Sequence, residues 1–143
     1  MEHYNKAFQN LEHPFAWLDL DALNQNIDYV NKSCGDKHVR IATKSIRSVE
    51  VLQLIAKRLN HFAGYMTFTA SESLFLFEKG LDQLLIGYPV YEEPAISKLA
   101  EWVKKGKSLT FMVDHVQQAA LLNTIARKVG VTLAICVDIN VST

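Results

Sequence analysis

A lysine at the end of a short apolar segment is the residue best suited to covalent chemistry in this sequence. Residues 39–44 read VRIATK, and the side chains of a β-strand alternate between two faces, so Arg40, Ala42 and Lys44 would share one face. A lysine amine condenses with an aldehyde, and a nearby cation together with partial burial favours the reactive, uncharged amine. We therefore expect Lys44 to form a bond to a carbonyl group, with Arg40 supplying the nearby charge or a hydrogen bond.

Other polar residues follow predicted strands and would lie at the same edge of a parallel sheet, where α/β folds form their ligand sites. These residues are Thr67, Thr69, Tyr88, Asp114, Asp138 and Asn140. Two cations on an inward face need anions, and a phosphate-bearing ligand together with Asp114 and Asp138 would supply them. The alternative for each residue, Lys44 included, is a solvated strand end without a function.

The elements that would position these residues alternate between strands and helices. Strands are predicted in short apolar runs at residues 15–19, 39–44, 65–68, 84–87, 109–113 and 133–138. The segments between them have helical periodicity, and four of them end at a glycine, the residue that best tolerates a helix C-terminus. This alternation predicts an α/β fold with parallel strands and right-handed crossovers. An open doubly wound sheet and part of a (β/α)₈ barrel both fit.

Composition excludes several function classes. Lys+Arg and Asp+Glu both total 15, which argues against a nucleic-acid binder. No apolar run is long enough for a membrane span, and the start lacks the core of a signal peptide. Cys34 and Cys136 form no CxxC pattern, so we expect reduced thiols in a cytoplasmic protein. The histidines have no metal-ligand spacing, so no metal site is predicted. The sequence has no GxGxxG or Walker A motif, which argues against a dinucleotide or nucleotide site.

Three segments carry a resemblance to a known family. Residues 14–23 read PFAWLDLDAL and are followed by Asn26-Ile27, residues 40–48 read RIATKSIRS, and residues 137–140 read VDIN. In this order and spacing they resemble alanine-racemase-like, fold-type III pyridoxal-phosphate enzymes over about the whole chain. The lysine segment is similar to that of the D-threonine aldolase and D-serine dehydratase branch. That branch commonly has histidines two residues before and two after the lysine, where this sequence has Ala42 and Ile46.

The resemblance implies a barrel that carries pyridoxal 5'-phosphate, followed by a β-domain. Lys44 matches the Schiff-base lysine at the end of the first barrel strand, and Arg40 matches an arginine near the cofactor ring. Asp138 would be a further cofactor contact. Residues 15–19 would then lie outside the barrel, paired with the β-domain. The cofactor would serve as electron sink for a carbanion at the α-carbon of a small amino acid.

The length of the chain limits what it is expected to do. A barrel takes about 250 residues, so residues 1–143 would form a truncated barrel of about five βα units. The later strands, the phosphate-binding loops, the β-domain and the second acid/base would be absent, and this portion would be inactive. The expected parent is an amino acid racemase, aldolase or dehydratase. A non-catalytic pyridoxal-phosphate-binding homologue and an unrelated flavodoxin-like binding domain are the alternatives. An unpaired last strand predicts a homo-oligomer.

Overall fold

A single parallel sheet forms the centre of the protein in the computed structural model, which describes residues 2–139 and 141. Its five strands are β1 (Val39–Ala42), β2 (Phe62–Thr67), β3 (Leu84–Ile86), β4 (Leu109–Val113) and β5 (Ala134–Val137). They pair in sequence order, and every pair is parallel. The helices are α1 (Glu2–Phe8), α2 (Leu20–Cys34), α3 (Val49–Arg58), α4 (Ala70–Glu78), α5 (Glu93–Lys104) and α6 (Val116–Val129), and a 3-10 turn, η1, spans Thr43–Ser45.

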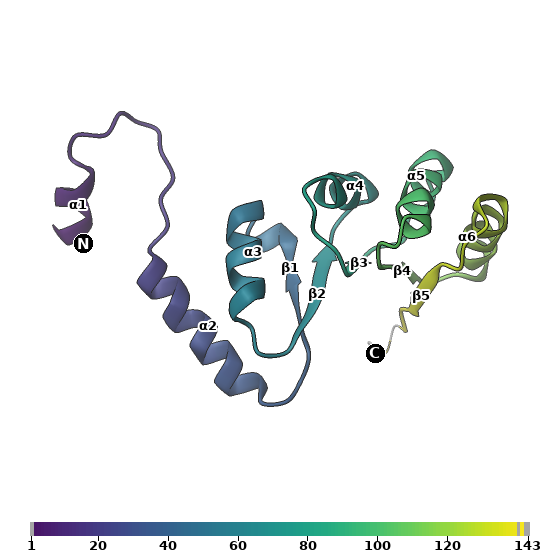
Figure 1. Ribbon diagram of the computed structural model, residues 1–143, viewed down its shortest axis with the longest axis horizontal. Helices are drawn as coiled ribbons and strands as arrows, with labels where there is room; N and C mark the ends of the chain where they lie inside the picture. Colours follow the sequence, from purple (N-terminus) through teal and green to yellow (C-terminus); the bar gives the residue numbers. More distant parts are fainter. Residues whose placement is uncertain (1, 140, 142–143) are drawn as a thin grey trace.

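The order of the strands decides between the two predicted architectures. Each crossover adds the next strand on the same side of the sheet, so the crossing helices α3 to α6 all lie along one face (Figure 1). A doubly wound sheet would reverse direction at a switch point and place helices on both faces. The arrangement therefore fits the barrel segment. No helix within residues 2–139 has the length and apolar character needed to cross a membrane.

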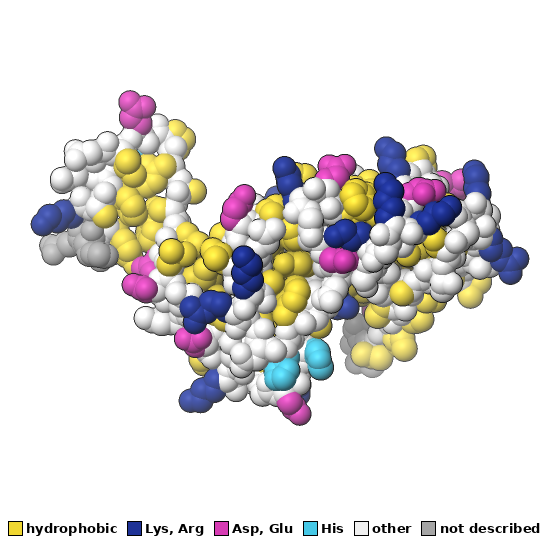
Figure 2. All heavy atoms as spheres, viewed as in Figure 1, with side chains coloured by type: hydrophobic (Ala, Val, Ile, Leu, Met, Phe, Trp, Pro, Cys, Tyr) yellow, Lys and Arg dark blue, Asp and Glu magenta, His cyan; other side chains and the backbone are white. Residues whose placement is uncertain are grey.

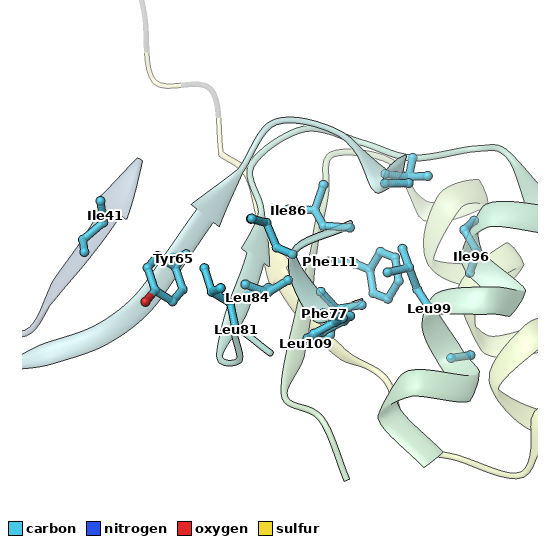
Figure 3. Packing of buried hydrophobic residues seen from close by; sticks show 14 of the residues in the cluster. Ile41, Tyr65, Phe77, Leu81, Leu84, Ile86, Ile96, Leu99, Leu109 and Phe111 are labelled. Carbon is cyan, nitrogen blue, oxygen red and sulfur yellow. The ribbon is translucent and has the colours of Figure 1, made fainter. Parts of the chain in front are cut away.

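The hydrophobic core lies between this face of the sheet and the helices. The register aligns Tyr65 with Leu84 and Leu109, and aligns Ile86 with Phe111, so that these side chains point together toward the helices (Figure 3). Buried helical side chains meet them, among them Phe77, Ile96 and Leu99. Side chains on the opposite face are only half-buried at Ala42, Met66, Leu85, Thr110 and Met112. One face of the sheet is therefore closed and the other is open.

Five of the six predicted strands are present, and their observed ends differ from the predicted ends by up to three residues. The sixth predicted strand, Phe15–Asp19, pairs with no strand of the described chain, and its pairing with a β-domain stays a prediction. Phe15 and Trp17 instead pack against Phe8 of α1, with ring centroids 5.3 and 5.2 Å apart. Asp19 caps α2 by accepting a 2.9 Å hydrogen bond from the backbone N–H of Ala22.

The last strand forms an apolar edge. All four residues of β5 are exposed, and Ile135 and Val137 retain 48% and 62% of their accessible surface. Ile139, just after the strand, is 73% exposed. Figure 2 shows hydrophobic side chains gathered beside the C-terminal end, whereas charges of both signs are interspersed over the helices. The backbone N–H and C=O groups along the outer edge of β5 pair with no strand of the described chain.

Candidate active site at the carboxyl edge of the sheet

Lys44 lies at the carboxyl end of β1, within the turn η1. The predicted alternation holds along this segment, because Ile41 and Thr43 are buried toward the helices while Arg40 and Lys44 are exposed. The Lys44 Nζ reaches across β2 and lies 5.8 Å from the centroid of the Tyr88 ring, which follows β3. No ion pair involves Lys44 within the described residues. The amine is therefore accessible, and it lies among the strand ends.

An aromatic pair lies beside the amine through its Tyr88 ring. Tyr88 packs edge-on against Phe68, the residue that follows β2, with centroids 4.8 Å apart. Both rings are nearly half exposed. Tyr88 was predicted to lie at this edge, whereas Phe68 was not singled out. Together the rings form an apolar platform beside the lysine, and such a platform attracts a cation only modestly at an exposed site.

Glu72 connects the elements around the lysine. Its Oε1 is 2.7 Å from the hydroxyl of Thr43, the residue before Lys44, and its Oε2 accepts a 2.7 Å hydrogen bond from the Phe68 N–H. Thr43 is buried at 1% exposure. Sequence reasoning missed this carboxylate. The available signal was the capping-box spacing of Thr69 and Glu72, which begins α4.

Arg40 does not approach Lys44. Its Nη1 donates a 2.9 Å hydrogen bond to the carbonyl oxygen of Gln83, the residue before β3. That carbonyl lies toward the amino end of the sheet, whereas Lys44 lies beyond the carboxyl end of β1. Between the two strands the guanidinium crosses Gly64, where an added Cβ would lie 2.7 Å from Nη1. The geometry thus assigns Arg40 a structural contact, and its predicted contact with a cofactor stays a prediction.

The predicted acidic residues do follow neighbouring strands. Asp114 comes directly after β4, and Asp138 directly after β5. The backbone N–H of Asp138 donates to the Val113 carbonyl oxygen at 2.8 Å, which holds the two strand ends together. Both carboxylates are exposed, and neither forms an ion pair with Lys44 in this part of the chain. Asn140 lies outside the described residues.

The predicted threonines have structural contacts. The buried hydroxyl of Thr67 lies 2.7 Å from that of Ser73, on the helix side of the sheet. Thr69 caps α4 by accepting a 3.1 Å hydrogen bond from the Glu72 N–H. For these two residues the alternative without a functional role fits the geometry. Neither side chain joins Lys44.

A pocket of about 330 Å³ adjoins the lysine between the first turns of α3 and α4. Its rim includes Lys44, Arg47 and Glu72, and its floor includes Leu52 and Leu76. Arg47 has a left-handed backbone, with φ of 51°, and its Nε donates to the Lys44 carbonyl oxygen at 3.2 Å. Charged groups of both signs thus surround an apolar floor beside the amine.

Comparison with known proteins identifies the family. Residues 18–143 match the model described as "Alanine racemase, N-terminal domain". A curated relative, 3-hydroxy-D-aspartate aldolase of Paracoccus denitrificans, is 35% identical over 134 aligned residues, and the match covers 91% of this chain and 34% of the relative. This chain thus spans about a third of the length of that relative.

Solved structures have the same fold. D-threonine aldolase from Filomicrobium marinum superposes with a TM-score of 0.78 at 20% identity, over 92% of this chain and 35% of that chain. D-threo-3-hydroxyaspartate dehydratase from Delftia sp. HT23 superposes with a TM-score of 0.77 at 21% identity, over 90% of this chain and 34% of that chain. The predicted partial barrel is confirmed, and the flavodoxin-like alternative was wrong. The chain belongs to the family of the alanine racemase N-terminal domain.

Proposed function

We propose that Lys44 binds pyridoxal 5'-phosphate covalently in a protein that acts on a small amino acid. The observation that carries this proposal is the position of the Lys44 amine, which is accessible among the strand ends and lies beside the Tyr88 ring without an ion pair in the described chain. Family membership supports the same residue, because the segment around Lys44 resembles the lysine segment of these enzymes. When bound, the cofactor withdraws electrons from the substrate's α-carbon.

The residues of this chain fit such a ligand. Lys44 would hold the cofactor through its uncharged amine, and the cofactor would supply the aldehyde group for this attachment. The open face of the sheet beside Ala42 leaves room for a planar ring. Tyr88 and Phe68 would exclude water from one side of it. Asp138 remains a predicted contact, as does Arg40, which would have to leave the Gln83 carbonyl oxygen.

The relatives suggest a substrate class. One is named for 3-hydroxy-D-aspartate and another for D-threonine, which are both D-amino acids with a hydroxyl group on the β-carbon. We propose this class for the whole protein, with cleavage or dehydration next to the α-carbon as the reaction. A second candidate is a binding homologue without turnover. Ala42 and Ile46 favour it, because imidazoles that the aldolase and dehydratase branch commonly has near its lysine are missing.

Reductive trapping tests the attachment site. The protein is incubated with pyridoxal phosphate, reduced with borohydride and digested, and the modified peptide is identified by mass spectrometry. We expect the adduct on Lys44 and its loss in Lys44→Arg. Lys79→Arg is the matched control, because the Lys79 Nζ also lies over an aromatic ring, 5.5 Å from the centroid of Phe75. An adduct spread evenly over the lysines would refute the proposal.

A second measurement separates the enzyme from the binding homologue. A full-length protein that contains this chain is incubated with D-amino acids bearing a β-hydroxyl group in deuterated water. Exchange of the α-proton, or release of an aldehyde or keto acid, indicates catalysis. An adduct on Lys44 without exchange or product on any amino acid indicates binding alone.

We further propose that the protein is cytoplasmic and that a second copy of the chain is its partner. Cys34 and Cys136 are free thiols, as expected in a reducing compartment. The exposed apolar strand β5 supports self-association, because a second copy could cover its edge.

A further inference from the structure

We propose that Glu72 is a positioning residue for Lys44, an inference that rests on the function proposed for that lysine. The first observation concerns the start of α4. In an ordinary capping box, the glutamate at the third helical position returns to the N–H of the capping residue. Here Thr69 caps the helix, but the Glu72 carboxylate accepts its backbone hydrogen bond from the N–H of Phe68, one residue before the capping residue. Its other oxygen leaves the helix and meets Thr43.

The second observation is what these contacts hold in place. Thr43 immediately precedes Lys44, and its buried hydroxyl donates to the Glu72 Oε1 at 2.7 Å, with the Met66 carbonyl oxygen as an alternative acceptor at 3.1 Å. Phe68 supports Tyr88, the ring beside the lysine nitrogen. One carboxylate therefore fixes both the backbone that carries the amine and the aromatic group that flanks it. Glu72 touches no part of the amine itself and acts through Thr43 and Phe68.

The matched control lies in the neighbouring helix. Glu50 also occupies the first turn of its helix, α3, and its carboxylate accepts a 3.0 Å hydrogen bond from the capping residue Ser48. This contact stays within the helix start and does not reach the strand that carries Lys44. Glu50→Ala therefore removes a comparable local contact without loosening the lysine.

The experiment measures the position of the amine directly. Reductive methylation with ¹³C-formaldehyde labels the lysines, and Lys44→Arg identifies the Lys44 signal in a carbon–proton spectrum. In the wild-type protein this signal should be shifted upfield by the Tyr88 ring. We expect the shift to disappear in Glu72→Ala and Thr43→Val, and to persist in Glu50→Ala. Glu72→Gln and Thr43→Ser keep hydrogen-bonding groups and should restore it.

Trapping with pyridoxal phosphate gives the second readout. The share of adduct on Lys44, relative to the other lysines, should fall about tenfold in Glu72→Ala and Thr43→Val, because misplacement by about an ångström has effects of this size or larger. Unchanged methyl shift and adduct share in both variants would overturn the positioning role. Equal losses in Glu50→Ala would also overturn it, because they would indicate general loosening.

The two proposals fail in different ways. If wild-type protein forms no adduct on Lys44 but its methyl shift depends on Glu72, the function proposed for the lysine fails and the positioning role stands. If Glu72→Ala does not fold, as judged by circular dichroism, Thr43→Val decides the outcome, since it removes the hydroxyl and leaves the helix cap intact.

Discussion

The nitrogen of Lys44 lies 5.8 Å from the centroid of the Tyr88 ring, although strand β2 separates the strands that these residues follow. A lysine side chain is long enough to span one intervening strand, since parallel neighbours lie about 4.8 Å apart. The contact thus depends on the sequential strand order and on the turn η1, which ends β1 before Lys44.

Removing the Tyr88 ring should leave the Lys44 amine less well positioned. Tyr88→Leu should reduce the share of Lys44 in reductive trapping, because the Tyr88 ring lies beside the Lys44 nitrogen and helps to place it among the strand ends. Tyr88→Phe should retain it. Tyr91→Leu is the control, since Tyr91 is an exposed residue of the same loop. Equal trapping in Tyr88→Leu and wild type would show that the ring has no part in placing the amine.

Gly64→Ala should destabilise the sheet strongly. Gly64 has φ of 113°, and an added Cβ would lie 2.0 Å from the Gln83 carbonyl oxygen, the acceptor of Arg40. We expect a loss of about 3 kcal/mol or more in urea unfolding. Gly80→Ala has a similar positive φ but nothing within 4 Å, and should cost only about 1–2 kcal/mol. Similar costs at the two positions would contradict the clash.

The core should respond to loss of Phe111. This side chain is 0% exposed, so Phe111→Ala should leave a cavity and cost about 3–5 kcal/mol of unfolding free energy. Val116, 81% exposed on α6, serves as control, and Val116→Ala should stay within about 0.5 kcal/mol of wild type. Denaturant unfolding monitored by circular dichroism measures both. A cost below about 1 kcal/mol for Phe111→Ala would contradict its place in the core.

Tyr65 should make stability fall at alkaline pH. Burial raises the pKa of the Tyr65 phenol above its ordinary value. As the pH rises, the unfolded chain therefore loses this proton before the folded protein does. The stabilisation is complete below the ordinary tyrosine pKa and is lost as the pH rises through it toward the raised value. Unfolding free energies between about pH 9 and 11 should fall less steeply in Tyr65→Phe. Parallel curves for the two proteins would exclude this role.

The edge of β5 should drive self-association. Val137→Lys places a charge on the exposed apolar strand and should shift the protein toward monomer in sedimentation at high concentration. Val116→Lys introduces the same charge on α6 and should leave association unchanged. A wild-type protein that stays monomeric at every concentration would refute the prediction.

The sequence predicted the strands of the sheet well, because buried parallel strands have a continuous apolar signal that depends only on local residues. The segment at Phe15–Asp19 has the same signal, but strand formation requires a neighbouring strand, and pairing is not local. Its aromatic residues pack against α1 instead. Apolar character alone therefore does not determine whether this segment, in which Trp17 and Leu18 are 49% and 46% exposed, forms a strand.

Within the site, the sequence predicted that Lys44 lies on the face of the segment opposite Thr43, but it did not predict the surroundings of the amine. Alternation along one strand is a local property and is confirmed by the burial of Thr43 and the exposure of Lys44. The contact between Thr43 and Glu72 joins residues 29 positions apart and depends on how α4 leaves β2. The hydrogen bond from Arg40 to the Gln83 carbonyl oxygen likewise depends on the register of β1, β2 and β3, and no single segment of the sequence determines that register.

The packing of Arg40 across Gly64 ties two positions on neighbouring strands to each other. A methyl group at position 64 would meet the guanidinium as well as the Gln83 carbonyl oxygen, so the arginine can lie across this point only while position 64 is a glycine. Among related proteins, an arginine at the position of Arg40 that makes this contact should therefore occur only together with a glycine at the position of Gly64, whereas the glycine can remain where the arginine is replaced. Such a one-way dependence would reveal, from inherited variation alone, that the two strands lie side by side.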